Sequence, residues 1–483
     1  MNLKLKDLWY WMANFALLGS AFLSMYMNNA YAMLAVAIPL ILFDRAYVIP
    51  TLLFIAAIEG SFKVEDAASE AESTAIMLMG PFLIYDFIRK NHKIIPFKLV
   101  LLYLIFGVFV VLGLFIYNMH PQIQQYVVAY MGKKPSAIGI YIKVAMKVIK
   151  IAFFFIYLKV FINGDKELLY RALTLLKDMT PYLVILVLLN MLMFGVVSSK
   201  FETLHFGESH HGDFSANMNA LGVYLYIGLL EEKTSWFKRL ISLAALAALL
   251  YIIMELASRN GLLTFVLLGC LSGLLVLWNR NLSFKVTVVA AAFFIVVAAA
   301  YMFKDSPTVE RFIYETEEEG GGDRWAYWSA GLSSLNEEPL FGLGGDENSS
   351  IYAVGKYSPG VEDHVMHNTF LEFAVEYGIL GLIFYMIFVC IILYHSAKNF
   401  LFAAKYNDVL LGAPSISYFI SIFAGLFVSR VWESTLWYNM SLVFGIYILW
   451  RKPIEDAIKS RKYFLLRGLP DPLDNPSLAL HPH

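Results

Sequence analysis

Long apolar runs separated by short polar stretches recur along the whole of this 483-residue chain. A helix needs roughly 17–25 apolar residues to cross a bilayer. We therefore predict an all-α polytopic membrane protein with about 12–14 transmembrane helices, the segment 30–60 being either two spans or one re-entrant hairpin. The candidate spans lie near 7–27, 30–43, 46–60, 74–88, 97–117, 138–162, 180–197, 216–230, 238–256, 261–278, 284–303, 372–394, 409–428 and 435–450.

One polar interruption is much longer than the others and runs from Lys304 to His367. We predict that residues 304–366 form a single long loop that carries short helices. The chain then divides into N-terminal transmembrane helices (1–200), a transmembrane core that includes the loop (201–450), and a basic tail (451–483). The end of the tail is rich in proline and lacks periodicity, so we expect it to be disordered.

Composition agrees with the membrane assignment, since 59% of the residues are hydrophobic and 16% are charged. Soluble domains are about half apolar and a quarter charged. The two cysteines, Cys270 and Cys390, fall inside predicted spans. We expect them to be small core residues rather than a disulfide framework.

The distribution of charge predicts the orientation of the chain. The predicted loop 304–366 holds thirteen Asp or Glu against four Lys or Arg, whereas basic residues gather in the loops on the other side and in the tail. Cytoplasmic loops carry the excess of Lys and Arg. We therefore expect both termini to be cytoplasmic and the long loop to be extracytoplasmic, where neither ATP nor nucleotide sugars are present. The chain also has no Gly-rich phosphate-binding loop.

Among the arginines on the predicted outer face, which run against the usual bias, the candidates for a function are Arg259, Arg324 and Arg430. A guanidinium group suits phosphate oxygens because it binds them through two parallel hydrogen bonds. The alternative is that each side chain snorkels to lipid headgroups or pairs with a nearby acid, as Arg430 would with Glu433. We favour phosphate binding for Arg259 and Arg324, and pairing for Arg430.

A second cationic feature is the set Lys143, Lys147 and Lys150, whose spacing places them on one helical face. This stripe would hold either a lipid diphosphate or an acidic glycan. Equally, it would suit an interfacial helix whose lysines face water.

His367 opens a predicted helix whose first turns contain Glu372 and Glu376. A neutral imidazole accepts a proton at physiological pH. Taken alone, His367 is more simply read as a structural loop residue. The His205, His210 and His211 group has no standard metal-ligand spacing, so we predict no metal site there.

Several short motifs appear in one order along residues 205–450. The first motif, Gly212–Ala220, has a Gly-x-Phe segment followed by two asparagines. No proline lies between these asparagines, although one often does in segments of this kind. The motifs are Gly212–Ala220, Ser258–Gly261, Asp323–Trp328, Pro339–Gly344, His367–Leu371 and Gly378–Gly381. Together they resemble the O-antigen ligase and polymerase family of oligosaccharyltransferases.

The resemblance implies a metal-independent, inverting glycosyltransferase of GT-C-like helical fold that needs no cofactor. Its members transfer a glycan from undecaprenyl diphosphate to a hydroxyl acceptor at the outer face of the bacterial inner membrane. By position, His367 would be the general base, and Arg259 and Arg324 would grip the diphosphate. We add Glu372 or Glu376 as residues that orient His367.

The expected product is an O-antigen or exopolysaccharide chain built from repeat units. The alternatives are an O-antigen ligase that acts on lipid A–core, a protein O-oligosaccharyltransferase, and a transporter of lipid-linked sugars. The implied partners are the lipid-linked donor, the acceptor, membrane lipids and a chain-length regulator protein, with no nucleic acid. A transporter is disfavoured because the unusual charges gather at one face and no repeat is visible.

Overall fold

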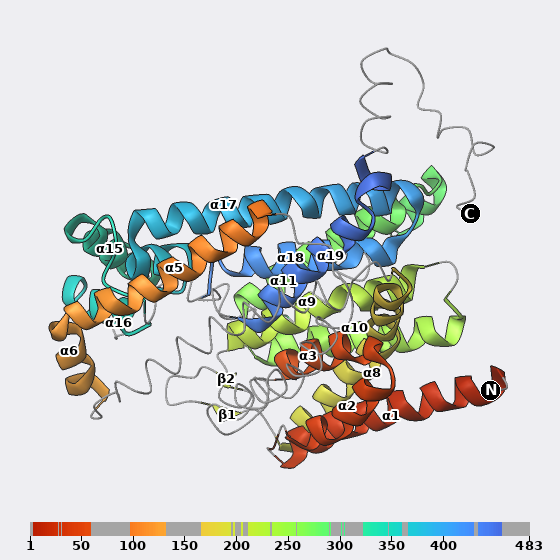
Figure 1. Cartoon of the computed structure of the whole chain (residues 1–483). Coiled ribbons are helices and arrows are strands. Elements are labelled where there is room, and N and C mark those ends of the chain that lie inside the picture. Colours follow the sequence, from red (N-terminus) through yellow and green to blue (C-terminus); the bar gives the residue numbers. More distant parts are fainter. Residues whose placement is uncertain are drawn as a thin grey trace.

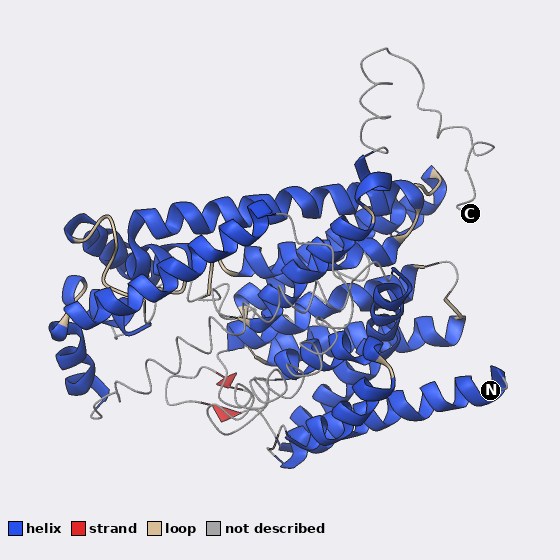
Figure 2. Cartoon of the chain, in the orientation of Figure 1, coloured by secondary structure: helices blue, strands red, loops and turns tan. Residues whose placement is uncertain are grey.

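The computed structural model of the chain describes residues 3–58, 97–131, 166–194, 211–288, 322–359, 366–428 and 433–455, apart from isolated positions, and two short strands. In these ranges the chain is a bundle of helices, which confirms the predicted all-helical membrane class (Figure 1). The strands β1 (Val197–Ser198) and β2 (Leu204–His205) pair antiparallel, with Val197 opposite His205 (Figure 2).

Most of the described helices overlap the predicted apolar runs, but the helix Lys166–Phe194 begins well before the predicted span 180–197, and the helix Thr369–Tyr406 continues well past the predicted span 372–394. The segment 30–60 contains two helices, α2 and α3, joined by the short η1. Whether they are two spans or one re-entrant hairpin stays a prediction. The described helices are α1 (Leu3–Met27), α2 (Tyr31–Phe43), η1 (Arg45–Tyr47), α3 (Val48–Ile58), α5 (Phe97–Met119), α6 (Pro121–Met131), α8 (Lys166–Phe194), α9 (His211–Leu230), α10 (Trp236–Glu255), α11 (Arg259–Leu277), α15 (Gly322–Glu337), α16 (Glu347–Tyr357), α17 (Thr369–Tyr406), α18 (Val409–Ala424) and α19 (Ser434–Leu449).

Four of the described helices are long and apolar enough to cross a bilayer, namely α8, α10, α11 and α17. Shorter apolar helices include α2, α18 and α19. The predicted spans 74–88 and 138–162, and most of 284–303, lie outside the described residues. The total of 12–14 spans and the GT-C-like arrangement therefore stay predictions.

α9 is the central helix of the bundle. It packs against α8, α10, α11 and α18, and every residue from Phe214 to Leu225 is buried. A helix surrounded by others on all sides belongs in a protein interior. Its low hydropathy in the sequence comes partly from Asn217 and Asn219, which are buried and hydrogen-bonded.

The two ends of the bundle carry different helix ends and loops. At one end, Lys177 pairs with Glu231 at 2.7 Å, and Asn279 donates to the Lys405 carbonyl at 3.2 Å. α1 begins and α19 ends at this end, whereas α15 and α16 lie at the opposite end (Figure 1). The loops that we predict on one side of the membrane thus lie together; the compartment that each end faces stays a prediction.

The prediction that the cysteines are core residues is wrong. Cys270 on α11 and Cys390 on α17 are both exposed. The outer surface of a membrane helix faces lipid, where a small apolar thiol is as well accommodated as in a core.

Candidate active site

Two glycine motifs are joined by backbone hydrogen bonds where α17 is interrupted. At Gly378 the backbone leaves the helical region, with φ 69° and ψ −174°. The freed carbonyl of Val375 accepts from the Leu343 N–H at 2.8 Å, and the Ile379 N–H donates to Pro339 at 2.8 Å. The Pro339–Gly344 segment therefore replaces helical hydrogen bonds that the interruption removes.

Glycine is required on both sides of this junction. Gly342 and Gly378 have positive φ, which L side chains rarely adopt. A Cβ on Gly378 would also collide with the Leu340 carbonyl, and one on Gly342 would collide with the Val375 carbonyl. The junction fixes the first three turns of α17, which carry Glu372 and Glu376, against the loop that contains α15 and α16.

His367 lies just before α17 and is held from two sides. Its φ is 49°, and its half-buried ring meets the edge of Tyr327 on α15, with ring centroids 5.9 Å apart. Asn368 caps α17, because its side chain accepts from the Phe370 and Leu371 N–H groups. The position of the imidazole is thus set by the helix cap and by the buried Tyr327.

The turn that follows α18 receives both the start of α17 and the start of α15. Thr369 donates its hydroxyl to the Val428 carbonyl and its N–H to the Gly425 carbonyl, both at 2.8 Å. The guanidinium of Arg324 lies 5.9 Å from the ring centroid of Phe427. The turn Gly425–Val428 therefore brings Arg324 and the segment that carries His367 to one region.

The hinge that carries Arg259 reaches the same turn through α9. Gly261 lies so close to Ser215 on α9 that a Cβ would collide with it. The next residue, Ala216, packs against Ala424 and Val428. Arg259 is half-buried, at the first position of α11, where the N-terminus of the helix favours anions. The starts of α15 and α17 thus contact the turn directly, and the start of α11 is linked to it through α9.

Buried amides on α9 support this hinge. Asn219 donates to the Gly261 carbonyl at 2.8 Å and to the Thr264 hydroxyl at 2.7 Å. Asn217 donates to Glu433 at 3.3 Å and accepts from the Thr435 hydroxyl at the start of α19. The paired asparagines of the first motif therefore hold neighbouring elements in place.

The sequence analysis did not predict the Gly425–Val428 turn, and it gave no separate role to Tyr327 or Asn260, which lie within two of the motifs. Asn260 is 6% exposed, and within the described part of the chain neither polar atom of its side chain has a hydrogen-bond partner. A buried amide without such bonds is costly. In the sequence, the indication of a role for Asn260 is its position next to Arg259.

Glu372 and Glu376 are both buried, at 6% and 2% exposed. Their expected role in orienting His367 stays a prediction. The lysines of the cationic stripe (Lys143, Lys147 and Lys150) lie outside the described residues, as does Arg430. Glu433, the expected partner of Arg430, accepts from Asn217.

Part of the chain is similar to a known protein family. Residues 243–386 match the family model described as O-antigen ligase. The match includes Arg259, Arg324 and His367, together with both glycine motifs, whereas the Gly212–Ala220 motif and the Gly425–Val428 turn lie outside it. No curated protein matches the chain.

Proposed function

We propose that the chain, whose residues 243–386 match the O-antigen ligase family model, is a membrane glycosyltransferase that moves a glycan from undecaprenyl diphosphate to a hydroxyl acceptor on the extracytoplasmic face. One observation carries the proposal. The half-buried Arg324 and the segment that carries His367 both contact the Gly425–Val428 turn, and the hinge of the half-buried Arg259 is linked to that turn through α9. Cations beside a titratable base suit a reaction whose leaving group is a diphosphate.

In the proposed reaction His367 accepts the proton of the acceptor hydroxyl as its oxygen forms the new bond to the anomeric carbon. The bond between that carbon and the diphosphate oxygen breaks, and its electron pair leaves with the diphosphate. Arg259 and Arg324 stabilise this growing charge more in the transition state than in the ground state. Attack from the face opposite the leaving group inverts the anomeric configuration, and no metal is needed.

Asn260 and the buried carboxylates complete the proposed site. Asn260 would hydrogen-bond to donor oxygens, because these would satisfy its buried amide. Glu372 or Glu376 would orient His367. Arg430, and the lysine stripe Lys143, Lys147 and Lys150, would bind further phosphate or acidic sugar groups.

The acceptor we favour is a second lipid-linked repeat unit, which makes the protein a polymerase of O-antigen or exopolysaccharide. A polymerase holds two lipid diphosphates, and the lysine stripe offers a second anionic contact. The alternatives are transfer to lipid A–core, as in a ligase, and transfer to serine or threonine of a protein. We place the enzyme in the bacterial inner membrane with both termini cytoplasmic, beside a chain-length regulator protein.

The experiment that tests this function supplies the purified protein with an undecaprenyl-diphosphate oligosaccharide as the sole substrate. A ladder of longer lipid-linked chains supports the polymerase. Product formed only after lipid A–core is added supports the ligase. If neither substrate set gives product, and the wild-type protein remains folded and monodisperse, the proposed transferase activity is wrong.

A further inference from the structure

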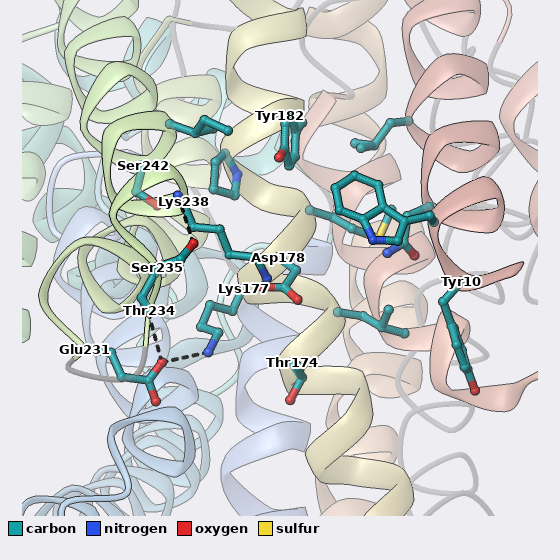
Figure 3. A pocket seen from close by; sticks show the side chains of 18 of the residues that line it. Tyr10, Thr174, Lys177, Asp178, Tyr182, Glu231, Thr234, Ser235, Lys238 and Ser242 are labelled. Carbon is teal, nitrogen blue, oxygen red and sulfur yellow. Dashed lines mark hydrogen bonds and ion pairs between the residues drawn. The ribbon is translucent and has the colours of Figure 1, made fainter. Parts of the chain in front are cut away.

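A cavity of about 700 Å³ lies at the end of the bundle opposite the candidate active site. Figure 3 shows side chains from α1, α8 and α10, and from the loop before α10, around it. Its walls include the apolar side chains of Trp11, Phe15, Met179 and Ile241. No residue assigned to the glycosyl transfer lines this cavity, so its use is a separate question.

Four charged side chains line the cavity, and their formal charges sum to zero. Lys177 pairs with Glu231 at 2.7 Å, and both side chains are about one-fifth exposed, at 18% and 22%. Lys238 pairs with Asp178 at 2.9 Å and is more accessible, at 48% and 33%. The cavity therefore presents an inner and an outer ion pair (Figure 3).

The apolar wall continues onto the outside of the bundle. Trp11 is 65% exposed and Phe15 is 79% exposed. In a membrane protein such a surface contacts acyl chains. A ligand that fits both parts has a charged head in the cavity and hydrocarbon along α1, so it is an amphiphile rather than a free polar metabolite.

We propose that this cavity binds a zwitterionic phospholipid with a primary ammonium headgroup, of the phosphatidylethanolamine type. The phosphate takes Lys238 as its partner, and the ammonium donates to Asp178, so the lipid replaces the more exposed ion pair and leaves no charge unpaired. An anionic phospholipid would leave Asp178 without a cation. A quaternary choline headgroup has no N–H to donate to the carboxylate.

This proposal is tested by native mass spectrometry of the detergent-purified full-length protein. The lipids are phosphatidylethanolamine, phosphatidylglycerol and phosphatidylcholine with identical acyl chains. The expected result is that phosphatidylethanolamine binds about tenfold more tightly than the other two, as loss of a charge-assisted hydrogen bond predicts. Equal binding of either competitor overturns the proposal, whatever the transferase assay shows.

Single substitutions assign the binding to this cavity. Lys238→Ala should weaken phosphatidylethanolamine binding about fivefold or more, and Asp178→Asn should remove its advantage over phosphatidylcholine. Lys452→Ala, at an exposed lysine that does not line the cavity, is the matched control and should leave binding unchanged. Lys238 and Asp178 are both solvent-accessible, so the melting temperatures of the Lys238→Ala and Asp178→Asn variants should stay near that of the wild type. Equal loss in the Lys452 control, or none in the Lys238 variant, also overturns the assignment.

Discussion

The hydroxyl of Thr369 donates to the carbonyl of Val428 at 2.8 Å, across 59 positions of the sequence. Thr369 follows His367 by two residues, and Val428 follows Phe427, the residue that Arg324 contacts. The proposed base and one proposed diphosphate-binding cation are therefore attached to the same turn. A displacement of this turn therefore changes the positions of both groups in the site.

Replacing Thr369 by Val removes the hydroxyl but keeps the shape of the side chain. The buried Val428 carbonyl then loses its partner, which costs about 1–3 kcal/mol. We expect a lower melting temperature and a lower turnover number, because His367 loses its anchor to the turn. Thr369→Ser keeps the donor and should retain most of the activity. Initial rates of chain growth check this, and a wild-type rate for Thr369→Val would contradict the anchoring role.

Replacing His367 tests the proposed base. His367→Asn is the preferred variant because Asn tolerates the positive φ at this position but cannot act as a base near neutral pH. General-base catalysis contributes roughly 10²–10⁴-fold, so turnover should fall by that factor. The melting temperature should be close to that of the wild type. Full activity in this folded variant would exclude His367 as the base.

Replacing Arg324 by Ala should impair use of the donor. Losing the bonds of one guanidinium to a diphosphate costs about 2–3 kcal/mol, or about 30–150-fold in kcat/KM for the donor. Arg324→Lys should recover part of this loss. Lys356→Ala is the matched control from the same loop, since Lys356 pairs with the exposed Glu337 at 2.6 Å. A defect confined to the acceptor would contradict the diphosphate assignment.

The sequence predicted the helices better than their contacts. Apolar runs mark α10 and α11 within a few residues, because the length of a span is set by the bilayer, whereas α17 continues to Tyr406, well past the predicted end near 394. The cysteines were misassigned since hydropathy does not tell whether a helix face meets lipid or protein. The sequence does not reveal that the asparagines of α9 are buried, because the groups that satisfy them are far away in the chain.

In the candidate site, too, the sequence predicted the residues better than the contacts between them. Arg259, Arg324 and His367 were predicted from charge placement and resemblance, and the structure attaches the segments of Arg324 and His367 to one turn that the hinge of Arg259 reaches through α9. That turn was not predicted, because Thr369 donates to the backbone carbonyls of Gly425 and Val428. Every residue has a backbone carbonyl, so the sequence does not indicate which carbonyls accept these hydrogen bonds. Tyr327 was missed for a similar reason, since its contact with His367 depends on how α15 docks.

The interruption of α17 at Gly378 gives the last prediction. Gly378→Ala places a Cβ at positive φ, which costs about 1–2 kcal/mol, and brings it against the Leu340 carbonyl. We expect a lower melting temperature and reduced turnover, because the Pro339–Gly344 segment must move away from α17.

Gly273→Ala on α11 is the matched control, because a Cβ there meets no atom within 4 Å. It should leave activity unchanged and raise stability by about 0.5–1 kcal/mol, as expected for Gly→Ala inside a helix. Thermal unfolding and chain-growth rates measured on both variants check the pair. Equal behaviour of the two alanines would show that the junction between the two glycine motifs does not position the site.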